Sequence, residues 1–117
     1  TNPIFPAVAT ESRIRWAGLA PETFAWYTTY ENIGYCKPNP DYYREILRYL
    51  GCRAEDCLMV GNDVEEDMMA AQAAGLSVFL LTDCLLNRKE KDISSYPQGD
   101  FDALLAFVEE WGGEASL

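Results

Sequence analysis

Short apolar runs alternate with stretches of helical periodicity along this chain, and each change of period predicts a new element. The runs at 57–61 and 77–81 have the length and apolar character of buried strands. Between them, residues 64–74 are rich in helix formers and stop at Gly75, a suitable helix C-cap. A strand, a helix and a second strand in this order predict a parallel β-α-β unit and an α/β fold class.

The residues before this unit predict two helices and a third strand. Residues 6–19 predict a helix that ends near Gly18, and the apolar spacing within 40–50 predicts a second helix that ends at Gly51. Between them, the aromatic and β-branched residues at 24–29 predict a strand.

The residues after the β-α-β unit predict a loop, a helix and a tail. Residues 83–99 are polar and rich in turn formers, which predicts a loop. A last amphipathic helix is expected over 102–111, and 112–117 is expected to be a frayed tail.

Composition narrows the classes of partner. The chain has 19 Asp and Glu against 9 Lys and Arg, a net charge of -10 without a basic patch, so we expect no nucleic-acid partner. No apolar run approaches the roughly 18 residues of a membrane helix and no signal peptide is visible, so we expect a cytoplasmic protein without a membrane partner. The four Cys lack Cys-x-x-Cys spacing and His is absent, which argues against zinc and against Ser-His-Asp catalysis.

An acidic cluster follows the first predicted strand, at the start of the predicted helix. Asp63 and Asp67 are four residues apart, so both can lie on one face of the first turn, next to Asn62. Open α/β sheets bind ligands at this edge, and a hard divalent ion such as Mg²⁺ would neutralise the cluster. A simpler alternative makes Asp63 an ordinary N-cap, with Glu66 completing a capping box and Asp67 solvated.

A second motif stands upstream, in the sequence Lys37-Pro38-Asn39-Pro40. Pro38 disfavours helical backbone at Lys37, and Pro40 is well placed to open the helix over 40–50. The lysine is therefore held at a defined position just before a helix. A single lysine is usually solvated, but this one is followed by a strand that ends in Gly-Asn-Asp.

With these two motifs the chain resembles the haloacid dehalogenase-like (HAD) hydrolase superfamily, most members of which are phosphatases. Lys37-Pro38-Asn39-Pro40 matches the third family motif, and Gly61-Asn62-Asp63 followed by Asp67 matches the fourth. Thr1-Asn2-Pro3 looks like the second motif, a Thr or Ser at the end of a strand. The resemblance runs to about Trp111 and implies a Rossmann-like three-layer α/β/α core with a parallel sheet.

The first family motif, an Asp-x-Asp pair after the first strand, has no match. The sequence Asp100-Phe101-Asp102 follows no apolar strand, so we interpret it as a helix start with Asp102 as N-cap. We therefore expect residues 1–117 to be the C-terminal part of a HAD core domain. An upstream segment of the same protein would carry the nucleophile and the central strand, and the strand at 57–61 would show an open edge without it.

The resemblance implies a role for each matched residue. Thr1 and Lys37 are the catalytic candidates, and Thr1, Asn2 and Lys37 would bind the phosphoryl group of a small phosphorylated substrate. The candidate Mg²⁺ ligands are Asp63, Asn62 and Asp67, with the direct ligand left open between Asn62 and Asp63.

The implied function is a Mg²⁺-dependent phosphatase that acts on a small phosphomonoester through an aspartyl-phosphate in the complete protein. This chain alone is expected to be inactive. Two alternatives stay open: a dehalogenase or phosphonate hydrolase of the same fold, and a non-catalytic binding module. An upstream Asp-x-Asp would support a phosphatase, and a single upstream Asp would support a dehalogenase. The absence of both would support a binding module.

Overall fold

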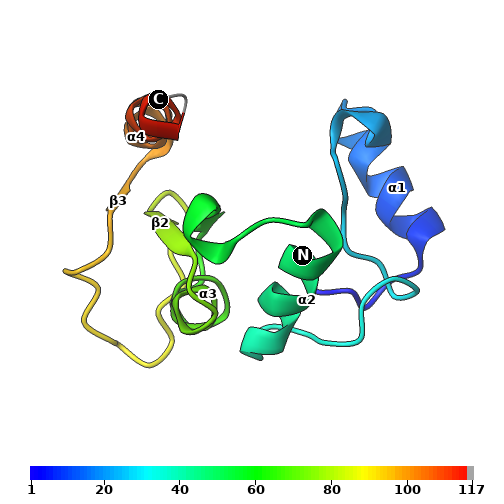
Figure 1. Cartoon of the computed structure of the whole chain (residues 1–117), viewed down its shortest axis with the longest axis horizontal. Coiled ribbons are helices and arrows are strands. Elements are labelled where there is room, and N and C mark those ends of the chain that lie inside the picture. The colour runs from blue at the N-terminus through cyan, green and yellow to red at the C-terminus, as the bar shows by residue number, and fades with distance from the viewer. Residues whose placement is uncertain (116–117) are drawn as a thin grey trace.

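The computed structural model describes residues 1–115, with side chains up to residue 111. The α-helices of this part are α1 (Ala7–Trp16), α2 (Pro40–Leu50), α3 (Ala70–Ala73) and α4 (Phe101–Ala115). Two 3₁₀ turns, η1 (Pro21–Thr23) and η2 (Ala54–Asp56), and one π-helical segment, η3 (Val64–Met69), complete the helical elements. The strands β1 (Leu58–Gly61), β2 (Ser77–Leu81) and β3 (Gln98–Gly99) form a parallel sheet in the order β1-β2-β3. Figure 1 shows the course of the chain, with β2 and β3 labelled.

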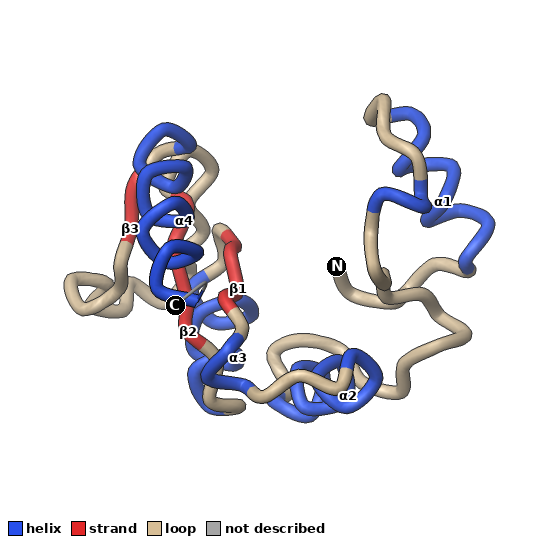
Figure 2. Tube along the Cα trace, turned by 45° about the horizontal axis from the view of Figure 1, so that its top comes forward, coloured by secondary structure: helices blue, strands red, loops and turns tan. Residues whose placement is uncertain are grey.

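Helices cover both faces of this sheet, as Figure 2 shows. Val78 and Leu80 of β2 point to one face, where they belong to the core cluster that also contains residues of η3, α3 and α2. Phe79 points to the other face, where its ring centroid lies 5.0 Å from that of Phe107 in α4. The chain therefore has the α/β fold with a parallel sheet that the sequence predicted.

The predicted helices 40–50 and 64–74 differ in regularity. α2 has the predicted bounds, begins with the Asn39 side chain accepting a hydrogen bond from the Asp41 amide, and ends at Gly51 with φ 66°. The segment 64–74 is helical, but its first half is the π-helical η3 and only its second half is α-helical. Gly75 follows with φ 94°, as expected of a helix end.

β1 lies at one edge of the sheet. It pairs with β2 in a register that places Met59 opposite Val78, and no described strand pairs with its other side. The open edge expected for the strand at 57–61 is thus present. Unpaired edge strands expose a row of backbone hydrogen-bonding groups.

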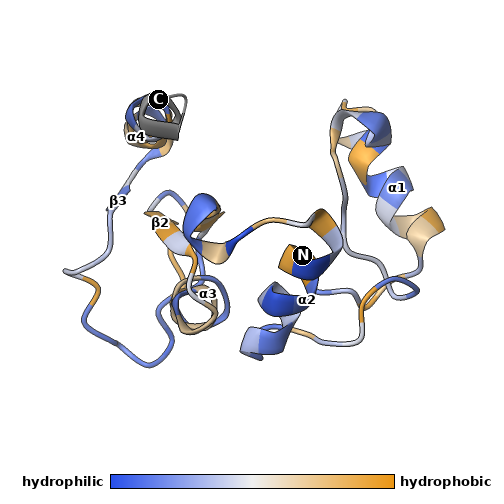
Figure 3. Cartoon of the chain, in the orientation of Figure 1, coloured by the Kyte–Doolittle hydropathy of each residue, from blue (hydrophilic) through white to orange (hydrophobic). Residues whose placement is uncertain are grey.

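The apolar residues of α1 lie outside the core. α1 contains no buried residue, and Val8 and Trp16 are 70% and 82% exposed. Figure 3 shows hydrophobic positions, in orange, on α1, which stands apart from the sheet. The helix predicted over 6–19 therefore forms in its central part, but within this chain its apolar side chains are not covered.

The strand predicted over 24–29 is wrong. This segment is irregular, and its residues form no ladder; Thr29 instead donates its amide hydrogen to the side chain of Asn32 at 2.8 Å. β-propensity measures how well a side chain fits a half-buried pleated surface, and no described strand lies beside this segment to provide one. The loop expected over 83–99 is largely a loop, but it ends in the short strand β3.

The assignment of Asp102 as N-cap is also wrong by two residues. Asp100 caps α4, because its carboxylate accepts a hydrogen bond of 2.9 Å from the Ala103 amide. Asp102 is already inside the helix. The predicted frayed tail begins within α4, which runs to Ala115, and residues 116–117 lie outside the described part.

Candidate active site

Two segments far apart in the sequence meet at the carboxyl end of β1. β1 ends at Gly61, and the chain turns there into η3. Lys37 stands just before α2, which packs against α3. From α2, the Tyr43 hydroxyl donates a hydrogen bond of 2.7 Å to the Glu66 carbonyl oxygen in η3, which fixes the two segments relative to each other.

Lys37 and Asp67 form a nearly buried ion pair. Lys37 Nζ lies 2.6 Å from Asp67 Oδ1, and the two side chains are only 12% and 5% exposed. A charged side chain shielded from water is costly unless it is paired with an opposite charge and hydrogen-bonded. The helix-capping alternative requires no contact between these residues, so it does not account for this arrangement.

The same carboxylate also fixes the turn after β1. Asp67 Oδ2 accepts hydrogen bonds from the amides of Asn62 and Asp63, both at 3.0 Å. The carboxylate packs directly over Gly61, where a Cβ atom would lie 2.5 Å from Asp67 Cβ. Only glycine fits under this side chain, which explains the Gly in the motif.

Asp63 begins η3 and is 8% exposed at its side chain. Its Oδ1 accepts hydrogen bonds from the Glu65 and Glu66 amides at 3.1 and 3.0 Å, and its Oδ2 lies 2.7 Å from Arg88 Nη1. Asp63 is therefore an N-cap, but Asp67 rather than Glu66 accepts the hydrogen bond from its amide. Burial alone would raise the pKa of Asp63, and these hydrogen bonds with the Arg88 charge outweigh it and lower the pKa.

This lowered pKa predicts an acid-sensitive contribution to stability. The ionised Asp63 stabilises the fold above the unfolded-state pKa of about 3.9, and that contribution is lost as pH falls through the lower folded-state value. Asp63→Asn keeps a capping oxygen but removes the charge. In urea unfolding, we expect the free-energy difference between wild type and variant to shrink from pH 7 to pH 3. A difference that does not change with pH would contradict the prediction.

Thr1 and Asn2 lie next to Lys37. Asn2 Oδ1 accepts a hydrogen bond of 2.7 Å from the Lys37 amide, and Asn2 Nδ2 donates one of 3.5 Å to the Lys37 carbonyl. The Thr1 carbonyl accepts hydrogen bonds from the hydroxyls of Thr28 and Tyr42. Direct contact of Thr1 and Asn2 with substrate stays a prediction.

The side-chain oxygen atoms that follow β1 suit a Mg²⁺ ion bound by few protein ligands. Asn62 Oδ1 accepts no hydrogen bond within residues 1–111, so this oxygen is open to a cation. Asp63 Oδ2 is paired with the exposed Arg88 guanidinium and becomes open to a cation only when Arg88 moves away. Mg²⁺ is commonly bound by one or two carboxylates, with water and substrate oxygens completing the shell. Among the described residues, no three His, Cys, Asp or Glu side chains are grouped to hold a metal. Both Asp67 oxygens already have partners, and its metal role stays a prediction.

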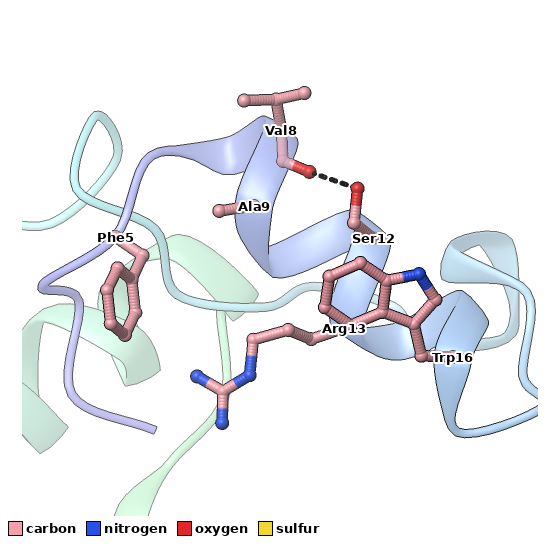
Figure 4. A pocket seen from close by; sticks show the side chains of 6 residues that line it. All are labelled: Phe5, Val8, Ala9, Ser12, Arg13 and Trp16. Atoms are coloured by element: carbon pink, nitrogen blue, oxygen red, sulfur yellow. Dashed lines mark hydrogen bonds between the residues drawn. The ribbon is translucent and has the colours of Figure 1, made fainter.

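One hollow of the surface reaches the site and another does not. A hollow of about 520 Å³ between α1 and α2 is lined in part by Thr1, Asn2 and Tyr42. A second hollow of about 550 Å³ along α1, shown in Figure 4, is lined by Ser12, Arg13 and four apolar residues and contains none of the predicted site residues. In that second hollow, the Arg13 guanidinium lies 5.6 Å from the centre of the Phe5 ring.

Sequence reasoning did not identify Arg88 as part of the site. Arg88 lies in the loop after β2, and a backbone bridge between Asp63 and Leu86 holds this loop beside the turn after β1. A signal was available, because the carboxyl ends of neighbouring parallel strands share one edge of the sheet. A basic residue after the second strand was therefore a candidate partner for an acidic cluster after the first.

An α/β fold with a lysine and acidic residues gathered at the carboxyl end of a strand is the arrangement that the family resemblance implies. The sequence model of the HAD-hydrolase-like family matches residues 34–97, more than half of the chain. The chain belongs to this family of hydrolases. No helix in the described part is both long and apolar enough to span a membrane.

Three known proteins show how far the similarity extends. A glyceraldehyde 3-phosphate phosphatase of Methanothermobacter thermautotrophicus is 39% identical over 64 residues, which are 55% of this chain and 28% of the phosphatase. The structure of a 2-haloacid dehalogenase from Pseudomonas syringae has a TM-score of 0.65 at 26% identity and covers 84% of this chain and 42% of its own. An uncharacterised protein from Listeria monocytogenes has a TM-score of 0.74 at 16% identity, covering 91% of this chain and 65% of its own, and shares the fold.

Proposed function

We propose that the protein to which this chain belongs is a Mg²⁺-dependent phosphatase that hydrolyses a small phosphomonoester through an aspartyl-phosphate. The ion pair between Lys37 and Asp67 carries the proposal, because it joins the two family motifs at the carboxyl end of β1. An ammonium group held there attracts both a phosphoryl group and an attacking carboxylate. Similarity to a phosphatase over 64 residues supports this reaction class.

Each site residue has a proposed task. Lys37 neutralises the phosphoryl charge, Thr1 binds a phosphoryl oxygen, and Asn2 contacts the substrate or fixes the Lys37 backbone beside it. Asp63, assisted by Asn62, holds the metal. Bound Mg²⁺ would shield the anionic nucleophile from the anionic substrate.

We further propose that an upstream segment of the same protein supplies the nucleophilic Asp and pairs with the open edge of β1. That edge and the uncovered apolar side chains of α1 support this, since exposed apolar surfaces mark interfaces. The chain also spans only 28% of the phosphatase that it matches. Residues 1–117 alone should then be inactive. We also propose a cytoplasmic location, because free cysteines suit a reducing compartment.

The test compares the complete protein with its Lys37→Ala and Lys89→Ala variants in the presence of Mg²⁺. The substrates are p-nitrophenyl phosphate and glyceraldehyde 3-phosphate, the compound named for the phosphatase relative. We expect Lys37→Ala to lower turnover by about a hundredfold to a thousandfold, because it removes a charge that stabilises the transition state. Lys89 pairs with Glu65 on the surface and serves as control. Unchanged turnover in Lys37→Ala would overturn the assignment.

A dehalogenase is the second candidate, on the strength of the similarity to the 2-haloacid dehalogenase structure. A 2-haloacid assayed beside the phosphate esters separates the two reactions. Halide release by the complete protein without Mg²⁺, combined with no phosphate release, would replace the phosphatase proposal.

A further inference from the structure

The two aspartates after β1 each have one basic partner, and the partners differ in exposure. Lys37, which pairs with Asp67, is 12% exposed. Arg88, which pairs with Asp63, is 63% exposed although the Asp63 side chain is only 8% exposed. An ion pair closed off from water is a fixed part of the fold, whereas a solvated guanidinium can leave its partner at little cost.

Backbone contacts bring Arg88 to this position. The Leu86 amide donates a hydrogen bond of 2.8 Å to the Asn62 carbonyl, and the Val64 amide donates one of 3.0 Å to the Leu86 carbonyl. The Asn62 side chain donates a further hydrogen bond of 2.7 Å to the Cys84 carbonyl. These bonds anchor the loop just before Arg88, so the guanidinium stays near Asp63 even when the ion pair opens.

Arg88 and a metal ion would use the same atom. Asp63 Oδ1 is occupied by two backbone amides of η3, which leaves Oδ2 as the oxygen that can bind a cation. Arg88 Nη1 lies 2.7 Å from this Oδ2. A guanidinium and a divalent cation repel each other, so they do not share one carboxylate oxygen at such short range.

We propose that Arg88 is a built-in counter-ion of Asp63 that a divalent cation displaces, so that Arg88 sets the metal affinity of the site. The inference rests on the proposed function, because it takes Asp63 as a metal ligand. Before the metal binds, Arg88 keeps the nearly buried carboxylate neutralised. When the metal binds, the ion pair opens and the guanidinium moves into solvent at the edge of the site.

The test measures Mn²⁺ binding to the complete protein by electron paramagnetic resonance of the free ion, with Mg²⁺ as competitor. Ionic strength is held constant, because exposed charges are screened by salt. The variants are Arg88→Gln, Asp63→Asn and the control Lys89→Gln. Lys89 Nζ lies 3.1 Å from Glu65 Oε1 and is 67% exposed, so the control removes an equal charge from the same loop without touching Asp63.

We expect Arg88→Gln to bind Mn²⁺ about tenfold more tightly than wild type, a gain of about 1.4 kcal/mol. Lys89→Gln should change the affinity by less than about threefold, because it alters only the long-range electrostatic field at the site. The Arg88 Nε–H resonance should also shift when Mg²⁺ is added to the wild-type protein. If Arg88→Gln and Lys89→Gln have equal affinities while Asp63→Asn loses the site, the counter-ion role is wrong and Asp63 remains the ligand. If Asp63→Asn binds Mn²⁺ as wild type does, the metal assignment in the proposed function is wrong.

Discussion

Replacing Gly61 by Ala is expected to destabilise the chain by about 3 kcal/mol, because the added methyl group overlaps the Asp67 side chain. Asp67 cannot move aside easily. Its two oxygens are held by Lys37 and by the amides of Asn62 and Asp63. The substitution therefore breaks hydrogen bonds in addition to creating a steric clash.

The measurement is urea unfolding of the purified chain followed by tryptophan fluorescence. Gly34→Ala is the matched control, because a Cβ atom at position 34 meets nothing within 4 Å. It should change the free energy of unfolding by less than about 0.5 kcal/mol. Equal stabilities of the two variants would show that the Asp67 carboxylate does not pack over Gly61 in solution.

The β-α-β unit was predictable because its pattern of apolar residues in the sequence matches the burial of those residues in the structure. β2 is buried on both faces, so its residues read as a continuous apolar run with no competing period. The glycine after α3 marks the helix end by its positive φ. The strand predicted over 24–29 failed because a strand also needs a neighbour, and local sequence does not report whether one is present.

The form of the helix after β1 was not predictable from helix propensity. The Asp67 and Met68 amides both lie within hydrogen-bonding distance of the Asp63 carbonyl, at 2.9 and 3.3 Å. The five-residue spacing is that of a π-helix, and propensity does not distinguish it from the four-residue spacing of an α-helix. π-helical turns are frequent at functional sites. In this chain the segment contains Asp67 and begins directly after Asp63.

The residues of the candidate site were easier to predict from the sequence than the ion pairs that they form. The motifs indicated that Lys37 belongs with the acidic cluster, but not that Asp67 rather than Asp63 would be its partner. That choice depends on side-chain geometry, because the Asp63 carboxylate is occupied by the amides of η3 and by Arg88. Arg88 lies in a polar loop without periodicity, so only the sheet topology brings it to the site.

Lys37→Met is expected to reduce the free energy of unfolding by about 3–5 kcal/mol, the cost of leaving a buried carboxylate without its partner. Most of that loss comes from the Asp67 charge, so the double variant Lys37→Met with Asp67→Asn should recover about 2 kcal/mol or more. Lys89→Met removes an exposed pair and should cost less than about 1 kcal/mol. Equal losses in Lys37→Met and Lys89→Met would show that the ion pair is not closed off from water.

The same double variant separates the structural role of Lys37 from its proposed catalytic role. In the complete protein, restored stability does not restore the ammonium group that the proposed mechanism places against the phosphoryl charge. We therefore expect the double variant to regain a large part of the stability lost in Lys37→Met and to keep the low turnover of Lys37→Met. If turnover returned together with stability, Lys37 would act only by holding Asp67 and the turn after β1, and its role would be positioning rather than catalysis.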